Sequence, residues 1–294
     1  MHYTHITPGQ RPLGALIDST LQIYSLKLAE IEDGSGLKWP LEVYGMVAAR
    51  DSVDHNRNIL FSRRRSNCQI LTQEDPFLRL TGPSRAIVSR EPLNVEIELK
   101  VKCATKSEDK PLMSFFCYYS GSHCGICTLY IPLEGDFCTM ELSSEEVYES
   151  VQATAVGIRV CVPEETPSIF KNGGRVVCSS LPRRRAKLPN PEHRTGPSFW
   201  QVVLQDGAMT SCSQGYLDLS RHVVFVKLCG MLEVLIEANS RSGAMAAQVS
   251  IQAIDCNITQ NECQLGDSKL EITVAWSRLV WDKLWITRGA NEEL

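Results

Sequence analysis

Cys124 and Cys127 are the residues whose type and spacing come closest to a metal or redox site. They lie in the segment GSHCGIC beside His123, and thiolates and imidazoles are ligands that zinc prefers. A structural zinc needs a second pair of ligands, and Cys256 and Cys263 are spaced too widely to supply it. We therefore expect a turn between two strands here and no metal.

Asp51 and Asp54 follow a predicted strand in the segment ARDSVDHNRN and could bind calcium. Clustered carboxylates do so in C2-type lipid-binding sandwiches, but calcium needs at least six oxygen ligands. No matching Asp-x-Asp loop occurs elsewhere in the sequence. Because Asp and Asn also close turns by accepting hydrogen bonds from nearby backbone, the segment favours a turn. A calcium- or lipid-binding C2-like sandwich is kept as an alternative.

The basic run Arg183, Arg184, Arg185 and Lys187 lies in a proline-rich stretch that we expect to be exposed. It could serve as a nuclear import signal or as a segment that binds a partner. Nucleic acid is not an expected partner. The chain holds 34 acidic and 30 basic residues, and its basic runs lack the interleaved aromatic side chains that nucleic-acid recognition uses.

Trp281, Leu284 and Trp285 have helical spacing after the last predicted strand. Side chains three and four positions apart share one face of a helix, so a short tail could carry an apolar stripe. We expect this stripe to dock on the body of the protein, and docking on a partner is the alternative.

The sequence contains no motif of a known catalytic class. A glycine-rich phosphate loop, a zinc-protease helix pair, a nucleophile elbow and a dinucleotide fingerprint are all absent from it. No catalytic residue, metal or cofactor is therefore predicted.

Most apolar stretches alternate with a period of two and are bounded by Gly, Pro, Asn or Asp, as strands are. Within 95–102 apolar and charged residues alternate strictly, which places one face in a core and one in water. Ser143 with Glu146 has the spacing of a capping box, so 143–149 is the one predicted helix. The predicted fold is all-β, an antiparallel β-sandwich or a barrel-like structure. Strands are predicted at 21–28, 41–49, 59–62, 85–89, 93–102, 113–119, 128–133, 151–162, 198–204, 223–228, 232–238, 248–254 and 269–279.

Prolines interrupt this pattern between residues 163 and 197, where the pair Gly173-Gly174 also occurs. A stretch of this length without strands of its own is interpreted as a long Pro-rich insertion loop. Two separate β domains on either side of the insertion are the alternative to a single sandwich. The predicted organisation is an N-terminal extension at 1–20, a β-rich domain at 21–280 that includes the insertion at 163–197, and a C-terminal tail at 281–294.

A short internal echo links the two halves of the chain. SRAIV, beginning at Ser84, precedes LNVEIEL, and SRHVV, beginning at Ser220, precedes MLEVLIEA. A β-arch repeated in each half would explain the echo, and coincidence is the other explanation.

Composition and cysteine usage point to a soluble intracellular protein. The 294 residues are 43% hydrophobic and 22% charged, as in globular chains, and no window is apolar for long enough to span a membrane. The opening MHYTHITPGQRPLG lacks the charged and apolar regions of a secretory signal. Twelve cysteines are spread along the chain, so we expect free thiols and a cytoplasmic, or alternatively nuclear, location.

Four long motifs carry a resemblance to a known family. They are KWPLEVYGMVAARDSVDHNRNILFSRRRSNCQ, FLRLTGPSRAIV, VEIELKVK and the closing KLEITVAWSRLV. Together they resemble a grass and cereal plant family catalogued as domain of unknown function 6598, over residues 21–280. The resemblance implies an all-β domain and supplies no catalytic or ligand residues.

Some relatives in that family occur beside a ribosome-inactivating toxin domain, so the resemblance implies a role in defence or stress. The toxin's glycosidase activity needs a Glu and an Arg one helical turn apart. The nearest such pair, Glu237 and Arg241, falls at the end of a predicted strand, so that activity is not expected here.

Two functions from different classes remain. The first is a non-enzymatic interaction module whose partner is another protein. The second is a hydrolase or transferase whose site is assembled from distant residues, for example with an activity linked to ribosome-inactivating proteins. A deep pocket lined by several convergent polar groups with shifted pKa values would support the enzyme, whereas a shallow surface would support the interaction module.

Overall fold

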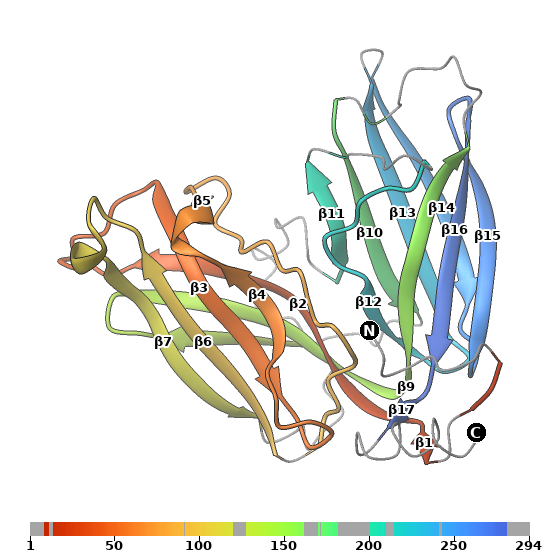
Figure 1. Cartoon of the computed structure of the whole chain (residues 1–294), viewed down its shortest axis with the longest axis horizontal. Helices are drawn as coiled ribbons and strands as arrows, with labels where there is room; N and C mark the ends of the chain where they lie inside the picture. Colours follow the sequence, from red (N-terminus) through yellow and green to blue (C-terminus); the bar gives the residue numbers. More distant parts are fainter. Residues whose placement is uncertain are drawn as a thin grey trace. The chain divides into compact units, whose positions relative to one another are not determined.

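The computed structural model describes ten stretches of the chain (Figure 1). They are residues 9–11, 14–90, 92–119, 128–161, 170, 172–181, 200–207, 209, 215–240 and 243–280. This part of the chain has no helix with the length and apolarity that a membrane crossing requires.

The described residues form antiparallel strands and two short 3-10 helices, η1 and η2, which confirms the all-β prediction. The elements are β1 (Ala15–Leu16), β2 (Asp18–Ile31), β3 (Leu41–Arg50), β4 (Asn58–Arg63), η1 (Arg65–Asn67), β5 (Gln69–Leu71), β6 (Leu93–Val101), η2 (Lys106–Glu108), β7 (Lys110–Tyr119), β8 (Thr128–Glu134), β9 (Cys138–Cys161), β10 (Gly174–Leu181), β11 (Val202–Gly207), β12 (Val223–Lys227), β13 (Met231–Ser240), β14 (Gly243–Gln252), β15 (Asn257–Leu265), β16 (Ser268–Ser277) and β17 (Leu279–Val280).

The chain divides into two compact units, with boundaries inside β2 after Thr20 and inside β9 after Glu146. We call residues 21–146 the first sandwich. The second sandwich comprises the described residues from 147 onward together with those before 21. This division corresponds to the alternative of two β domains, and its boundary lies in β9 and not in the predicted insertion.

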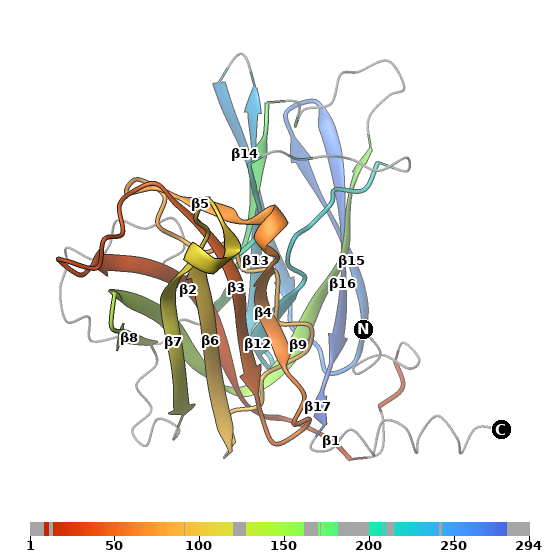
Figure 2. The same ribbon diagram turned by 60° about the vertical axis from the view of Figure 1, so that its left-hand side comes forward.

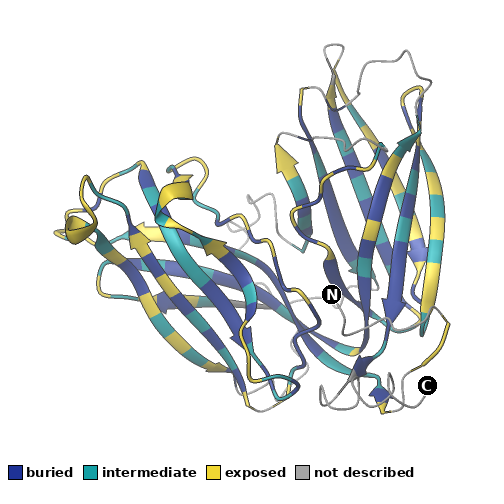
Figure 3. Cartoon of the chain, viewed as in Figure 1, coloured by how far each residue is buried: buried dark blue, intermediate teal, exposed yellow. Residues whose placement is uncertain are grey.

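The first sandwich places β4, β3, β6 and β7 side by side in one sheet, with β5 also paired to β3. β2 and β8 pair with β9 in the other layer (Figure 2). Along β6 buried and accessible positions alternate (Figure 3), as the sequence predicts. Val95, Ile97 and Leu99 lie in the core.

The second sandwich repeats this strand order. Its two sheets are β11-β10-β13-β14 and β12-β9-β16-β15, so β10, β11, β13 and β14 stand where β3, β4, β6 and β7 stand in the first. Its core holds Trp276 and Phe225, both with no exposed surface.

Register irregularities place the two sandwiches in residue-by-residue correspondence. The pairing of β3 with β4 shifts after Val47, and that of β10 with β11 shifts after Val176. Two positions earlier in each strand stands a glycine, Gly45 or Gly174. A Cβ at either glycine would clash with the carbonyl oxygen of a glutamate on the next strand, Glu98 or Glu237.

A second correspondence lies at the far side of each sheet. Met113 on β7 and Met245 on β14 occupy matching positions, because each pairs with the residue after that glutamate. The Sδ atom of Met113 would lie 2.9 Å from a Cβ at Gly135, and that of Met245 would lie 2.8 Å from one at Gly266. The echoed stretches LNVEIEL and MLEVLIEA lie on β6 and β13, which hold the same place in the two sheets, so the echo matches the repeated strand order.

The echo also marks a buried arginine in each sandwich. Arg85 and Arg221 are 6% and 1% exposed. The Arg85 guanidinium donates to both carboxylate oxygens of Asp51 at 2.7 Å and to the carbonyl of Ala86. Asp51 also accepts the backbone N–H of Val88 at 2.9 Å, so the pair ties the turn that follows β3 to residues 85–88 of the first sandwich.

Three local predictions are wrong. The stretch 85–89, predicted as a strand, lies between β5 and β6 and forms no named strand. Residues 143–149 belong to β9, because Ser143 pairs with Tyr130 of β8 and the ladder uses the backbone groups that a helix would need. Part of the predicted insertion loop at 163–197 forms β10, whose Val176, Val177 and Cys178 are buried. The rest of that stretch, apart from residues 170, 172 and 173, lies outside the described residues.

Replacing Arg85 by Met should destabilise the first sandwich by about 3–5 kcal/mol, because Asp51 would be left as a buried charge without its partner. Urea denaturation followed by tryptophan fluorescence and circular dichroism would measure this loss. The matched control is Arg79→Met. The Arg79 side chain is 64% exposed and lies 3.8 Å from Asp75, so its loss should cost less than about 1 kcal/mol. Equal losses for the two variants would contradict the account.

Candidate functional site

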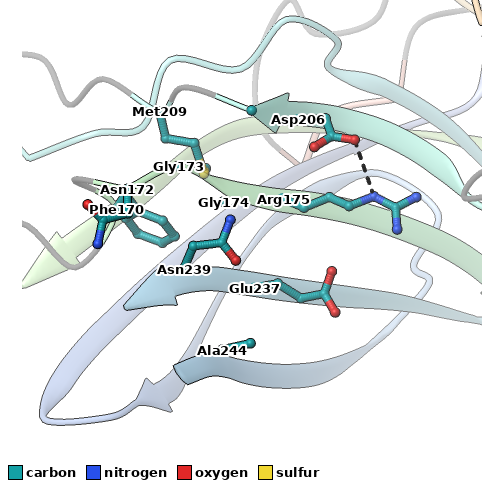
Figure 4. A pocket seen from close by; sticks show the side chains of 11 residues that line it. Phe170, Asn172, Gly173, Gly174, Arg175, Asp206, Met209, Glu237, Asn239 and Ala244 are labelled. Carbon is teal, nitrogen blue, oxygen red and sulfur yellow. Dashed lines mark ion pairs between the residues drawn. The ribbon is translucent and has the colours of Figure 1, made fainter. Parts of the chain in front are cut away.

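A pocket of about 780 Å³ opens at one end of the β10 sheet of the second sandwich (Figure 4). The start of β10, the ends of β11 and β13 and the start of β14 line it. Polar and apolar side chains share its wall. None of its lining residues was predicted as a site from the sequence.

Three charged side chains form a row across this pocket. Arg175 of β10 pairs in register with Asp206 of β11 on one side and with Glu237 of β13 on the other. Residues paired across strands project from the same face of a sheet, and Figure 4 shows the Arg175 side chain between the two carboxylates. Arg175 Nε lies 3.7 Å from Asp206 Oδ2. Two carboxylates and one guanidinium leave one negative charge in excess.

Glycines shape the floor of the pocket. A Cβ at Gly174 would lie 2.5 Å from the carbonyl oxygen of Glu237, 2.7 Å from Met209 Sδ and 2.8 Å from Phe170 Cδ1. Gly173 has a φ of +87°, a conformation that side chains with a Cβ rarely adopt. Close packing therefore requires a glycine at 174 and backbone conformation favours one at 173, whereas the sequence assigned this pair to the insertion loop.

Amide groups and small residues complete the wall. Asn172 and Asn239 each bring a carbonyl acceptor and an NH₂ donor. The backbone N–H of Asn239 donates to the carbonyl of Gly173 at 3.0 Å, which fixes the end of β13 against the start of β10. Ala244 on β14 is exposed and small, so this side of the pocket stays open.

The corresponding region of the first sandwich is filled by its own side chains. By the register, Tyr44 stands where the second sandwich has Gly173. The Tyr44 hydroxyl donates to Asp109 at 2.7 Å. Arg65 Nε donates to the same carboxylate at 2.7 Å, and its Nη2 donates to the carbonyl of Cys103 at 2.8 Å.

Asp109 is held in its charged form by these neighbours. The Arg65 guanidinium is the largest cause, and the backbone N–H of Cys103 and the Tyr44 hydroxyl add to it. Together they place the pKa of the Asp109 carboxyl well below its usual range. The Asp109 side chain is only 3% exposed, so this ion pair fills the first sandwich where the described residues of the second leave a pocket.

The carboxylates predicted from the sequence take part in a turn. Asp51 Oδ1 accepts the backbone N–H groups of Val53 and Asp54, and Asp54 Oδ1 accepts that of Asn56. Both oxygens of Asp51 also receive Arg85. Within the described ranges, no three His, Cys, Asp or Glu side chains are grouped so that they could hold a metal ion.

The other sequence-predicted sites lie outside the described residues. They are the pair Cys124 and Cys127, the basic run Arg183, Arg184, Arg185 and Lys187, and the apolar stripe Trp281, Leu284 and Trp285.

Every described thiol with a resolved pKa shift has its pKa raised, which disfavours the reactive thiolate. Burial raises the pKa of Cys138 and of Cys178 to about 12. The Cys138 thiol donates to the carbonyl of Leu112 at 3.1 Å. Because the thiolate is the nucleophile, buried thiols of this kind are core residues.

Comparison with known proteins places the chain in a family. A family model described as Domain of unknown function (DUF6598) matches residues 20–274. The chain belongs to this family. No curated protein matches the sequence.

Solved structures resemble this DUF6598 chain only distantly. One is a structure of the two C2 domains of Extended-Synaptotagmin 2, at 11% identity and a TM-score of 0.30, covering 95% of this chain and 96% of that one. Another is "Human GIVD cytosolic phospholipase A2", at 9% identity and a TM-score of 0.27, covering 90% of this chain and 31% of that one. At such values the likeness carries no argument about function.

Replacing Arg65 by Met should lower the stability of the first sandwich at neutral pH and much less in acid. The low pKa of Asp109 means that its stabilising contribution is present above its unfolded pKa of about 3.9 and is lost as pH falls through the folded value. Denaturant midpoints measured at several pH values would therefore differ most between wild type and variant above about pH 4. Arg64→Met is the control, since Arg64 is exposed. A difference that stays constant down to strong acid would contradict the ion-pair account.

Proposed function

We propose that this DUF6598 chain is a non-enzymatic interaction module that binds another protein through the pocket of its second sandwich. One observation carries the proposal. The two sandwiches share their strand order, their bulge and a glycine at which a Cβ would clash. The first fills the region with Tyr44 and Arg65, whereas the described residues of the second leave a pocket there. Because the strand order is shared, the pocket follows from the side chains that the second sandwich places at these positions.

The composition of the pocket supports recognition of a polypeptide. Its guanidinium, carboxylates and amides supply both donors and acceptors, which a peptide backbone with polar side chains can satisfy together. Phe170 and Met209 support the floor from below, at 1% and 7% exposure. A small number of placed polar groups on a rigid apolar support is typical of a binding site.

Filling the pocket with a side chain should abolish binding without unfolding the protein. Ala244→Tyr places an aromatic ring at the open side of the pocket, on an exposed strand position where tyrosine is well tolerated. Binding of the purified chain to an array of short random-sequence peptides should fall to background in this variant. Gln248→Tyr is the matched control. It lies on the same face of β14, four residues away, where Gln248 is exposed and pairs with Leu235.

Equal array signals for wild type, Ala244→Tyr and Gln248→Tyr would show that the pocket is not the binding site. Cleavage or modification of a bound peptide, followed by mass spectrometry, would contradict the non-enzymatic part of the proposal and favour a hydrolase or transferase. Intact peptides recovered after incubation are the expected result.

A further inference from the structure

The carboxylates of Glu237 and of its counterpart Glu98 differ in one hydrogen-bond acceptor position. In Glu98 the neighbouring strand fills this position, and in Glu237 it does not. Glu98 Oε1 accepts the Ser114 hydroxyl from the neighbouring strand at 2.9 Å. Glu237 pairs in the same way with Ala246, which has no donor to offer. A ligand that approaches from the β14 side can therefore supply the hydrogen bond that Ser114 supplies in the first sandwich.

The charge of the row determines which donor fits best. Arg175 stands between Asp206 and Glu237 and lies 3.7 Å from Asp206, and Glu237 is the carboxylate of this row on the side that faces β14. Hydrogen bonds between a charged donor and a carboxylate are about twice as strong as neutral ones. A cationic donor both completes the hydrogen bonding of Glu237 and neutralises the row.

The space beside Glu237 suits a long side chain. Ala244 and Ala246 are both exposed and small, and the pocket volume of about 780 Å³ exceeds what one side chain needs. The amides of Asn172 and Asn239 remain to hydrogen-bond the backbone that carries that side chain.

The chain shows how such a region is closed. In the first sandwich the cation at this end of the sheet is Arg65, whose guanidinium pairs with Asp109 and with the carbonyl of Cys103, while Glu98 receives Ser114. No arginine or lysine of the described second sandwich is seen in the equivalent role, since Arg175 belongs to the strand itself and forms the row with Asp206.

Resting on the proposed function, we infer that the second sandwich binds the arginine or lysine side chain of a protein partner, with Glu237 as the residue that receives the cation. Asn172 and Asn239 hold the partner's backbone. Arg175 sets the charge of the row and keeps Asp206 neutralised.

The test uses the full chain and the arginine- or lysine-containing peptide that gives the strongest array signal, with fluorescence anisotropy as the readout. Glu237→Gln keeps the shape of the side chain and removes its charge, so binding should weaken about ten- to hundredfold. The matched control is Glu98→Gln at the corresponding position of the first sandwich, which should leave binding unchanged. Added salt should weaken the wild-type complex, because it screens charge.

Two variants that copy the first sandwich give results of opposite sign. Arg175→Met introduces the residue found at the matching position, Met46, and removes the cation from the row, so the peptide should bind more tightly. Ala246→Ser introduces the hydroxyl of Ser114, which would donate to Glu237 and compete with the ligand, so the peptide should bind more weakly. Thermal unfolding of each variant should confirm that it is folded.

Loss of binding in Arg175→Met, or unchanged binding in Glu237→Gln, would overturn the inference, because the ligand would then be anionic or would not contact Glu237. Strongest array peptides that lack both Arg and Lys would overturn it as well. If peptide binding is still lost in Ala244→Tyr in these cases, the proposed function stands and only the inference about Glu237 fails. If no peptide binding is lost in Ala244→Tyr, the proposed function and the inference both fail.

Discussion

The close approach of neighbouring strands at Gly45 and Gly174 is the constraint on which the rest of the structure depends. At either glycine, a Cβ would clash with the carbonyl oxygen of the glutamate on the next strand. Each glycine therefore fixes the register of its sheet, together with the bulge that follows two residues later. In the second sandwich this register brings Asp206, Arg175 and Glu237 onto one face.

The two sandwiches differ in the side chains that lie beside this close approach of the strands. In the first, Tyr44 and Arg65 meet at Asp109, and Ser114 donates to Glu98, so the polar groups are paired within the chain. In the second, a glycine and an alanine stand at the positions of Tyr44 and Ser114. The shared strand order therefore carries different side chains at these positions, and the second sandwich has its pocket at this end of the sheet.

Local patterns predicted the fold well, because alternation along one strand already states which face is buried. The strict alternation at 95–102 corresponds to β6, and the echo beginning at Ser84 and Ser220 corresponds to the repeated sandwich. The spacing of residues within one segment gave a wrong prediction where pairing with another strand determined the structure, as at Ser143 in β9. The pocket could not be predicted, because its three charged residues lie far apart in the sequence and meet only through cross-strand register. The one local signal was the glycine pair Gly173-Gly174.

A crystal structure of the full chain is the most direct test that one sandwich is built twice, closed in the first copy and open in the second. After superposition of Gly45 on Gly174, Glu98 on Glu237 and Met113 on Met245, the bulges should coincide. The space over Gly174 should be open where Tyr44 and Arg65 fill the first sandwich. Bulges at different rows, or side chains of the chain itself filling the space over Gly174, would contradict the account.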